Sequence, residues 1–426
     1  MYNNIIEPIV ESDKCIGCGV CSSICPIDIL TMKINNEGMY QPYESDGCLT
    51  KCNLCLNVCP FMDDENYKIS EKLYLNEKTK FHKYLGYFYS TYEIYDKNDK
   101  NRLLSASGGG GYQILKHLLE KEYVDKVVTI VPNNDKDKLF KFSIFDEINQ
   151  LNKTRGSIYY PTELSQVLNY IKNNDGKYVI TALPCYAKAI RLAQEKNPKL
   201  RKRIKFVVGL VCGQMKSKKF TEELGLIATK SSSIEEVNFR IKKEGNDSSN
   251  FLFKFKSTEG TIGFLERKKE PNDFWSTRTF TPMACNSCTD VFAYNADIIL
   301  MDGWLPEYKK DYKGHTLTII RSKELDEIIQ NNKEIHIKQI NPSKIYNSQK
   351  GVVESKISIA KGSLNPLITL INKIKVKIQK LSNENYYKNK IKINSLISLL
   401  RKVEKINNLI KLPIRIIRKI KNKIGK

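Results

Sequence analysis

The sequence is poor in the residues that carry acid–base and nucleophilic catalysis. Its 426 residues include four histidines. These are scattered, at His82, His117, His315 and His336, and we expect them to be surface or packing residues. No Ser/His/Asp constellation and no carboxylate pair is evident, so the catalytic residues stay unassigned. This scarcity fits redox work, in which a cofactor carries the chemistry and the protein supplies position and electrostatics.

Long apolar runs and an export signal are also missing. No stretch approaches the roughly 18 apolar residues that span a bilayer, and no basic segment precedes an apolar run at the N-terminus. The chain nevertheless contains 41% hydrophobic and 10% aromatic residues, enough for a sizeable core in two or three domains. We therefore expect a globular cytoplasmic protein. In that compartment its twelve cysteines indicate metal or redox chemistry rather than a disulfide scaffold.

The positive charge is concentrated at one end of the chain. Residues 355–426 contain 19 Lys and Arg against two acidic residues, so they carry +17 of the net +23. The other 354 residues contain 51 basic and 45 acidic residues, a net charge of +6. We expect the tail to decide where the protein sits, and the nearly neutral body to hold its chemistry.

Three segments follow from the patterns of cysteine, apolar residues and charge. Residues 1–65 are cysteine-rich and too short for a large core, residues 66–350 form a body, and residues 351–426 form the tail. Within the body, strand patterns occur at 127–131, 178–181 and 206–211, and helical periodicity occurs at 112–122 and 186–194. The predicted fold class is α+β: a small cysteine-rich domain, a central α/β body and C-terminal basic amphipathic helices.

Eight cysteines in the first 60 residues form two similar runs. The first is a C-x2-C-x2-C-x3-C-P run, and the second has one extra residue between its first two cysteines. Bacterial ferredoxins use this spacing for two 4Fe-4S clusters, in which the fourth cysteine of each run binds the other cluster. Zinc and disulfides explain the runs poorly, because zinc sites use two separated pairs. We therefore assign one cluster to Cys15, Cys18, Cys21 and Cys59, and the other to Cys25, Cys48, Cys52 and Cys55.

Four further cysteines lie far apart in the sequence, at positions that could meet in the fold. Cys185 and Cys212 each follow an apolar strand pattern, and Cys285 and Cys288 form a C-x2-C pair. Because ligands gather where the strands of α/β sheets end, the four could bind one metal centre. Two alternatives stay open on spacing alone: a zinc site made of the same four residues, and core packing of Cys185 and Cys212.

A glycine-rich segment, Ser107 to Gly111, precedes a helical pattern. Glycines at the start of a helix let backbone N–H groups approach a phosphate, and the helix N-terminus favours an anion there. The run is not G-x-G-x-x-G, so by itself it is more typical of a flexible turn than of a phosphate site.

The order of these motifs resembles that of the family of coenzyme F420 hydrogenase/dehydrogenase beta subunits. The resemblance extends over about residues 10–310. Its motifs are the ferredoxin pair, Ser107-Gly-Gly, Arg155-Gly-Ser-Ile-Tyr159, Leu183-Pro-Cys185, Val211-Cys-Gly213, Cys285-x2-Cys288-x-Asp290 and Ala296–Trp304. Two departures bear on the substrate side: Ala182-Leu-Pro-Cys185 replaces Gly-Thr-Pro-Cys, and Gly213-Gln-Met replaces the usual His-Gly pattern.

The resemblance implies a flavoprotein with FAD bound in the central body. It also implies a third 4Fe-4S cluster, held by Cys185, Cys212, Cys285 and Cys288, on a path that continues to the ferredoxin clusters. Arg155 would pair with a phosphate through its planar, always-charged donor set. The residues expected near the flavin nucleotide are Ser107, Gly108, Gly109, Arg155, Gly156 and Ser157.

With this resemblance, the predicted function is an oxidoreductase that passes electrons between an organic two-electron substrate and 4Fe-4S clusters. The substrate would be coenzyme F420 or a similar compound, and a redox partner protein would take up or supply the single electrons. Two alternatives stay open. One is a non-catalytic electron-transfer subunit that docks to a partner dehydrogenase, and the other is a redox enzyme of surface-polysaccharide biosynthesis that does not use F420.

The basic tail has three candidate roles. Its helices could pack on the body or on a second subunit of a homo-oligomer. They could instead adsorb to an anionic membrane surface on the inner face, where each nearby Lys or Arg adds roughly 1 kcal/mol. Nucleic acid binding is disfavoured, because the tail has two aromatic residues for stacking, Tyr386 and Tyr387.

Overall fold

The structure is a computed structural model that describes residues 4–45, 47–49, 51–63 and 66–424. For residues 66 and 410–424 it describes the backbone alone. The first predicted domain boundary, after residue 65, lies outside the described residues.

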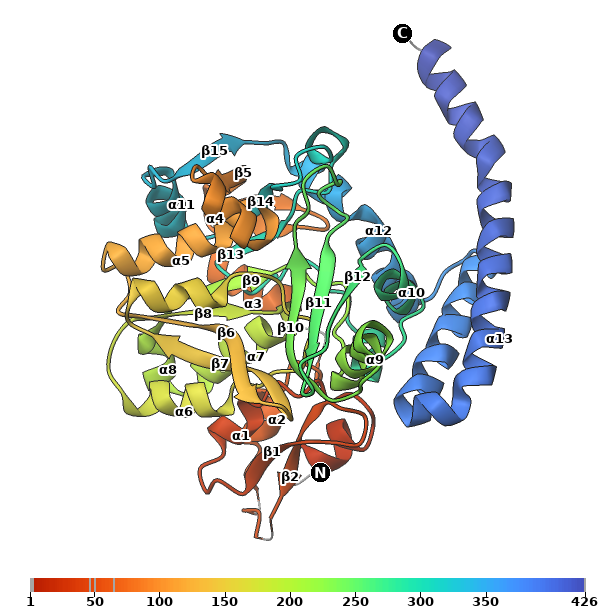
Figure 1. Ribbon diagram of the computed structural model, residues 1–426. Helices are drawn as coiled ribbons and strands as arrows, with labels where there is room; N and C mark the ends of the chain where they lie inside the picture. The colour runs from red at the N-terminus through yellow and green to blue at the C-terminus, as the bar shows by residue number, and fades with distance from the viewer. Residues whose placement is uncertain (1–3, 46, 50, 64–65, 425–426) are drawn as a thin grey trace.

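The N-terminal part is a small unit built around the two cysteine runs, at the bottom of Figure 1. Strands β1 (Leu30–Ile34) and β2 (Tyr40–Glu44) pair antiparallel. The cysteine runs contain the short helices α1 (Val20–Ile24) and α2 (Leu54–Asn57), and a π-helical turn, η1 (Ile6–Val10), precedes them. The buried apolar residues of this unit belong to the same core cluster as those of the central body. A segment too short for a large core of its own is therefore stabilised by packing on the body.

An eight-stranded sheet forms the centre of the molecule, with the order β15-β5-β14-β13-β9-β8-β6-β7. Its inner strands β13, β9, β8 and β6 are parallel, and the outer strands are antiparallel to their neighbours. The parallel strands are β6 (Lys126–Asp135), β8 (Tyr178–Ala182), β9 (Ile204–Leu210) and β13 (Ile298–Asp302). The others are β5 (Ser90–Asp96), β7 (Lys138–Phe145), β14 (Thr316–Ile320) and β15 (Ile335–Gln339). Strand β8 is buried throughout, which explains its continuous apolar sequence.

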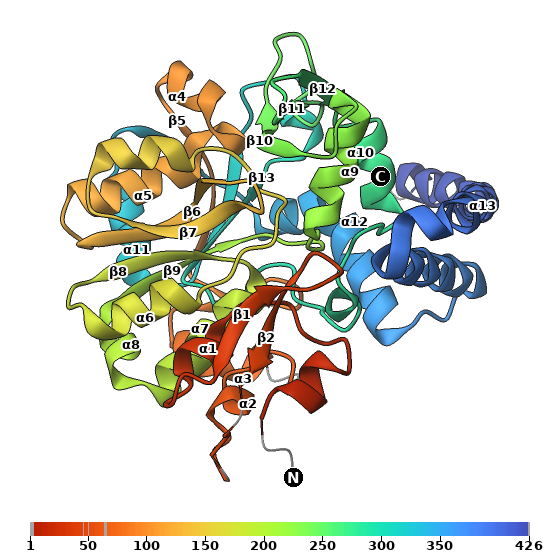
Figure 2. The same ribbon diagram turned by 60° about the horizontal axis from the view of Figure 1, so that its bottom comes forward.

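Helices cover both faces of this sheet (Figures 1 and 2). Alternate residues of β8 point to opposite faces, so Val179 packs in one core cluster and Ile180 in the other. The Val179 cluster contains α5 (Gly110–Glu120) and α11 (Lys323–Gln330). The Ile180 cluster contains α6 (Ser165–Asn173), α7 (Pro184–Lys196) and α8 (Pro198–Arg203). The body is therefore a mixed α/β layer structure, as the sequence predicts.

A second, antiparallel sheet stands beside the central one. It consists of β10 (Ile234–Ile241), β11 (Leu252–Ser257) and β12 (Ile262–Glu266), flanked by α9 (Lys218–Thr229) and α10 (Glu270–Ser276). Its core is rich in phenylalanine, including Phe239, Phe253 and Phe255. Shorter elements complete the body: α3 (Asn66–Tyr74), β3 (Lys80–His82), β4 (Gly86–Phe88), α4 (Asp99–Leu104), η2 (Ala106–Gly109), η3 (Ile148–Thr154), η4 (Met283–Asn286) and η5 (Pro306–Tyr308).

The C-terminal helices pack on the phenylalanine-rich core. Helix α12 (Pro342–Lys361) crosses the predicted boundary after residue 350, and α13 (Pro366–Ile424) follows it. Helix α13 bends at Asn385, where φ is −160° and ψ is 101°, and its two arms lie side by side (Figure 1). Both arms contribute buried residues to this core: Ile371, Ile374, Ile378, Ile393, Leu400 and Val403. Of the predicted roles for the tail, packing on the body is the one that these residues perform.

Among the described residues, the helices are all too short or too polar to cross a membrane.

Candidate functional site

Four thiols of the N-terminal unit line one cavity. They are Cys15, Cys18, Cys21 and Cys59, which come from the loop before α1, from α1 itself and from the end of α2. Gly17 lets the loop pass close to β2: its φ is +74°, and a Cβ there would lie 2.3 Å from the carbonyl oxygen of Tyr40. Four cysteines around one cavity are the donor set that a 4Fe-4S cluster takes.

The other four N-terminal cysteines line a second cavity, next to the first. These are Cys25, Cys48, Cys52 and Cys55. Between Cys48 and Cys52, Lys51 adopts a left-handed backbone conformation, with a φ of 71°. Burial raises the pKa of Cys21, and nearby thiols, among them Cys55 of the second set, raise it further. The two cavities are therefore neighbours. Each cavity is therefore lined by four of the eight thiols, and their assignment to two 4Fe-4S clusters stays a prediction.

Burial keeps several of these thiols protonated in the absence of a metal. It raises the pKa of Cys15 and of Cys55 to about 11, and that of Cys59 to about 12. Metal ligands must be thiolates, so cluster binding at these cavities would release protons.

The four later cysteines converge at the carboxyl edge of the central sheet. Cys185 lies in the first turn of α7, which follows β8, Cys212 follows β9, and the segment after α10 supplies Cys285 and Cys288. Burial raises the pKa of Cys185, and nearby Cys288, Cys212, Cys285 and Cys18 raise it further. The first three of these neighbours complete a set of four thiols with Cys185, and Cys18 belongs to the first N-terminal cavity.

The later cysteines also adjoin that first cavity through shared walls. Cys185 and Cys288 line a cavity together with Pro60 and Phe61. The same Pro60 and Phe61 line the cavity of Cys15 and its partners. The three sets of cysteines therefore form a continuous row from the central sheet to the N-terminal unit.

A large cavity of about 280 Å³ lies where the parallel strands β8, β9 and β13 end, and the segments 154–160 and 211–216 also line it. Cys212 lies in its wall, so this cavity adjoins the later cysteines. Of the residues predicted to lie near a flavin, Ser107, Arg155, Gly156 and Ser157 line it. Gly111 and Tyr112, in the first turn of α5, line it as well.

Arg155 is the cationic side chain that sequence analysis assigns to a phosphate. Its guanidinium stacks on the ring of Tyr112, 3.8 Å from the centroid, and donates to Asn101 (2.9 Å) and Asn152 (2.7 Å). Its buried Nε has no hydrogen-bond partner among the described residues. A buried, unpartnered donor at the wall of a cavity beside a helix N-terminus fits an anionic group such as the pyrophosphate of FAD.

Gly108 and Gly109 face the protein rather than the cavity. Gly108 and Gly109 are not among the lining residues, and both have positive φ angles, of +78° and +82°. A Cβ on Gly108 would lie 2.5 Å from the carbonyl oxygen of Gly314. These two glycines therefore shape the turn that presents Ser107 and α5 to the cavity.

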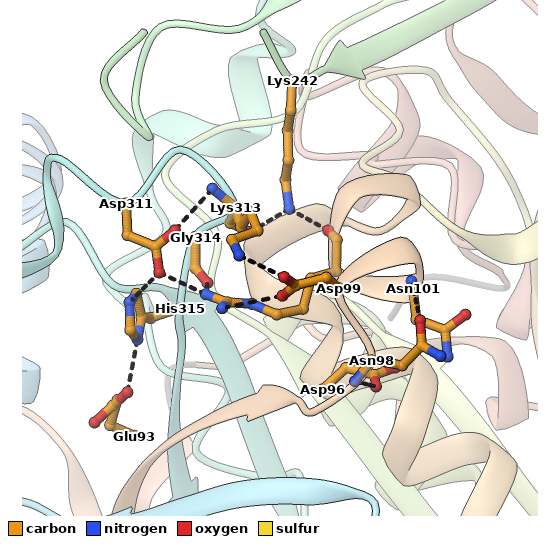
Figure 3. A network of polar contacts seen from close by, with 11 residues as sticks. Glu93, Asp96, Asn98, Asp99, Asn101, Lys242, Asp311, Lys313, Gly314 and His315 are labelled. Atoms are coloured by element: carbon orange, nitrogen blue, oxygen red, sulfur yellow. Dashed lines mark hydrogen bonds and ion pairs between the residues drawn. The ribbon is translucent and has the colours of Figure 1, made fainter. Parts of the chain in front are cut away.

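A network of polar contacts holds the loop that contains Gly314 (Figure 3). The ring of His315 contacts carboxylate oxygens of Glu93 (2.6 Å) and Asp311 (3.0 Å). Arg102, from α4, donates to Asp311 and to the carbonyl oxygen of Gly314, both at 2.7 Å. These contacts fix the loop against α4 and β5. Gly314 of the loop in turn packs against the turn at Gly108.

An ion pair joins the two sheets at the large cavity. Asp302, at the end of β13, accepts hydrogen bonds from Arg240 of β10 (2.9 Å for the Nη1–Oδ2 pair) and from the hydroxyl of Ser107. Burial alone would raise the pKa of Asp302, but Arg240 and Ser107 hold it below its usual value. The carboxylate charge is therefore balanced within the wall.

Comparison with known families places these features in context. Residues 91–169 match the model for the N-terminal part of the coenzyme F420 hydrogenase/dehydrogenase beta subunit, and residues 175–343 match the model for its C-terminal part. The chain belongs to the family of coenzyme F420 hydrogenase/dehydrogenase beta subunits. Residues 14–62 match a 4Fe-4S dicluster domain, which confirms the predicted ferredoxin-type domain of this family member.

Curated relatives agree with this family assignment. The chain is 25% identical to a subunit of the F420H2 dehydrogenase of Methanosarcina mazei over 214 residues, which are 49% of this chain and 55% of the relative. It is 25% identical to the coenzyme F420-dependent sulfite reductase of Methanocaldococcus jannaschii over 345 residues, which are 77% of this chain and 47% of the relative. The chain thus spans about half the length of these relatives.

A solved structure shares the fold. A chain of the F420-reducing [NiFe] hydrogenase complex from Methanosarcina barkeri superposes with a TM-score of 0.50 at 18% identity. The match covers 65% of this chain and 92% of that chain. The fold of that hydrogenase chain therefore extends to this protein.

Two lysines of this family member were not identified from the sequence. Lys216 lines the large cavity, and its Nζ donates to the carbonyl oxygens of Phe274 (3.0 Å) and Thr279 (2.7 Å). Burial, with Arg278 nearby, lowers its pKa well below the usual value. Lys356, from α12, donates to the Sγ of Cys288 at 3.1 Å. Neither position has a sequence signal, because a single lysine is typical of a solvated surface.

The Lys356 contact corrects an expectation about the tail. The charge distribution predicts that the tail decides where the protein sits and that the body holds its chemistry, but α12 carries Lys356 of the tail into the later cysteine set. The reason is that α12 packs against the segment that includes η4, so its inner face meets the core and not solvent.

Proposed function

We propose that this protein is an iron–sulfur flavoprotein oxidoreductase. It would pass electrons between an organic two-electron substrate, coenzyme F420 or a similar compound, and three 4Fe-4S clusters. Residues 1–65 would carry two clusters, residues 66–350 the FAD and the third cluster, and residues 351–426 the helices that support them. The observation that carries the proposal is the continuous row of cysteines, which starts at the wall of the large cavity.

The row suggests an order for electron transfer. Cys212 adjoins the large cavity, and Cys185 and Cys288 share walls with the first N-terminal cavity. Cys21 and Cys55 then link the two N-terminal sets. Electrons would follow this sequence of sites in either direction.

The residues of the large cavity support the flavin part of the proposal. FAD, when bound, would supply the exchange between two-electron and one-electron chemistry. Arg155 and the N-terminus of α5 would hold its phosphates, and the Asp302–Arg240 pair would fix the wall between the two sheets. The apolar residues of that wall, including Leu183 and Leu300, would exclude water.

The surface beside the second N-terminal set is suited to a redox partner protein. Ile27 and Leu49 line the cavity of that set and are exposed to solvent. Exposed apolar residues next to a redox centre favour transient docking. The name of the relative in Methanosarcina mazei, a dehydrogenase subunit, supports a partner for this chain.

Anaerobic purification followed by analysis of iron, sulfide and flavin tests the proposal. We expect about twelve iron atoms and one FAD per chain, because each 4Fe-4S cluster contains four. Reduction by F420H2 and by NADPH would then be followed by optical spectroscopy. A full iron content without flavin would contradict the enzyme proposal and favour a non-catalytic electron-transfer subunit. A bound flavin that neither donor reduces would favour a substrate other than F420.

Removal of one later cysteine tests the third cluster. We expect Cys285→Ser to lower the iron content to about eight atoms per chain while the ferredoxin signals in the EPR spectrum persist. Ser287→Ala, a change between the two cysteines of the same segment, is the control and should leave the iron content unchanged. An unaltered iron content in Cys285→Ser would contradict the third site.

A further inference from the structure

Lys356 holds a positive charge inside the set of later cysteines. Its side chain is 4% exposed, and its Nζ lies 3.1 Å from the Sγ of Cys288. The same Nζ donates to the carbonyl oxygens of Asp290 (2.7 Å) and Cys212 (3.3 Å). One ammonium group thus contacts the sulfur of one proposed cluster ligand, Cys288, and the backbone of another, Cys212.

No carboxylate of the described residues lies within ion-pair distance of this charge; the nearby Asp290 carboxyl has its pKa raised by burial, an effect that Lys356 opposes. The side chain of Asp290 accepts instead from the backbone N–H of Tyr294 at 3.1 Å. Arg278, a second cation of this region, donates to the side chain of Asn286 at 3.0 Å. Lys356 is therefore the described cation that contacts a sulfur of this set.

The C-terminal helices hold the cysteine segment in place. From α13, Gln379 donates to the carbonyl oxygens of Thr281 (3.0 Å) and Pro282 (2.9 Å), and Asn383 donates to Thr281 at 2.9 Å. These contacts fix the chain just before Cys285, and Lys356 fixes it at Cys288. All of these donors lie after residue 343, where the family match ends.

We propose that Lys356 is a positioning residue that raises the reduction potential of the third cluster. The inference rests on the proposed 4Fe-4S cluster at Cys185, Cys212, Cys285 and Cys288. A reduced cluster carries one more negative charge than an oxidised one, so a cation at a ligand sulfur favours the reduced state. The effect is large at a buried site, where charges interact more strongly than in water. Tuning by charge and by hydrogen bonds to sulfur is a general property of such clusters.

Redox titration of the anaerobically purified full chain, followed by EPR, tests the inference. We expect Lys356→Met to shift the midpoint potential of one cluster to a more negative value, and Lys356→Arg, which keeps the charge, to stay close to the native value. Lys350→Met is the matched control, because Lys350 lies on the same helix with 54% of its side chain exposed. It should leave all three potentials unchanged.

Iron analysis separates the failure of this inference from that of the proposed function. A native protein with about eight iron atoms would refute the third cluster itself. With about twelve, an unchanged potential in Lys356→Met would overturn the role of Lys356 alone. If the Met variant loses iron, the potential is measured instead in Lys356→Gln, which keeps a hydrogen-bond donor but not the charge. If both variants lose iron and Lys356→Arg does not, the role is structural and the tuning proposal is wrong.

Discussion

Side chains around the large cavity differ in how far the protein already satisfies their hydrogen bonds. Ser107 donates to Asp302, and the terminal nitrogens of Arg240 donate to the same carboxylate, so the Asp302 carboxylate is satisfied within the wall, although the buried Nε of Arg240 has no partner among the described residues. Arg155 retains a buried Nε without a partner among the described residues. A buried unsatisfied donor costs about 1–3 kcal/mol, and a bound anion would recover this energy.

Replacement of Arg155 should therefore weaken flavin retention more than folding. We expect Arg155→Met to release FAD at least tenfold more readily during gel filtration, because a charged hydrogen bond contributes about 1.5–3 kcal/mol. Flavin absorbance per chain measures the effect. Lys153→Met, at an exposed position two residues away, should retain its flavin. Equal flavin content in both variants would contradict the assignment of Arg155.

Site residues could be predicted from the sequence where a pattern recurs. The two cysteine runs predict how their eight thiols divide between two cavities, because each ligand spacing is a local property of the loop. The structure adds a requirement for glycine at Gly108 that the sequence does not reveal, the close contact with Gly314, while its predicted approach to a phosphate stays a prediction. Lys216 and Lys356 could not be identified, since their partners are carbonyls and a sulfur from distant segments.

At the scale of the element, helix α13 shows how apolar spacing selects one face. In its second arm, Ile393 is fully buried, with 0% exposure, while Ile391 has 86% of its surface exposed. The two residues have the same side chain and lie two positions apart, so they point in different directions from the helix axis.

This difference predicts unequal effects of the same substitution. We expect Ile393→Ala to lower the free energy of unfolding by about 2–5 kcal/mol, because it leaves a cavity in the phenylalanine-rich core. Ile391→Ala should change it by less than about 0.5 kcal/mol. Urea unfolding monitored by circular dichroism compares the two. Equal shifts in the midpoint would show that α13 does not pack on the body in solution.

The elements of the central sheet were predictable in part. The strand patterns at 127–131, 178–181 and 206–211 correspond to β6, β8 and β9, and the helical patterns correspond to α5 and α7. Their apolar periodicity reflects burial, which is local information. The antiparallel strands at both edges and the three-stranded sheet were not predicted, because their pairing depends on contacts between segments far apart in the sequence.

At the scale of the whole molecule, the basic tail has two parts that differ in their contact with the body. Residues up to Val403 pack on the body, whereas the end of α13 stands away from it (Figure 1). Residues 410–426 contain seven Lys and Arg and no acidic residue. An isolated basic helix with many isoleucines has the composition of a segment that adsorbs to anionic lipid.

Vesicle sedimentation measures this adsorption. We expect the full chain to sediment with vesicles that contain anionic lipid, less with neutral vesicles, and less again as salt is raised, because surface charges are screened. A chain that ends at residue 409 keeps the packed arms and should stay in the supernatant. Equal recovery of the two chains would exclude a membrane role for the end of the tail.

The positions of the large cavity and of the Ile27–Leu49 surface also have a kinetic consequence. The cavity lies at the carboxyl ends of the parallel strands of the body, and the Ile27–Leu49 surface belongs to the N-terminal unit. The organic substrate and the protein partner would therefore not compete for one place, and both could be bound in the same turnover. In steady-state assays, a high concentration of either one would then not inhibit competitively against the other, whereas a single shared site would produce such inhibition.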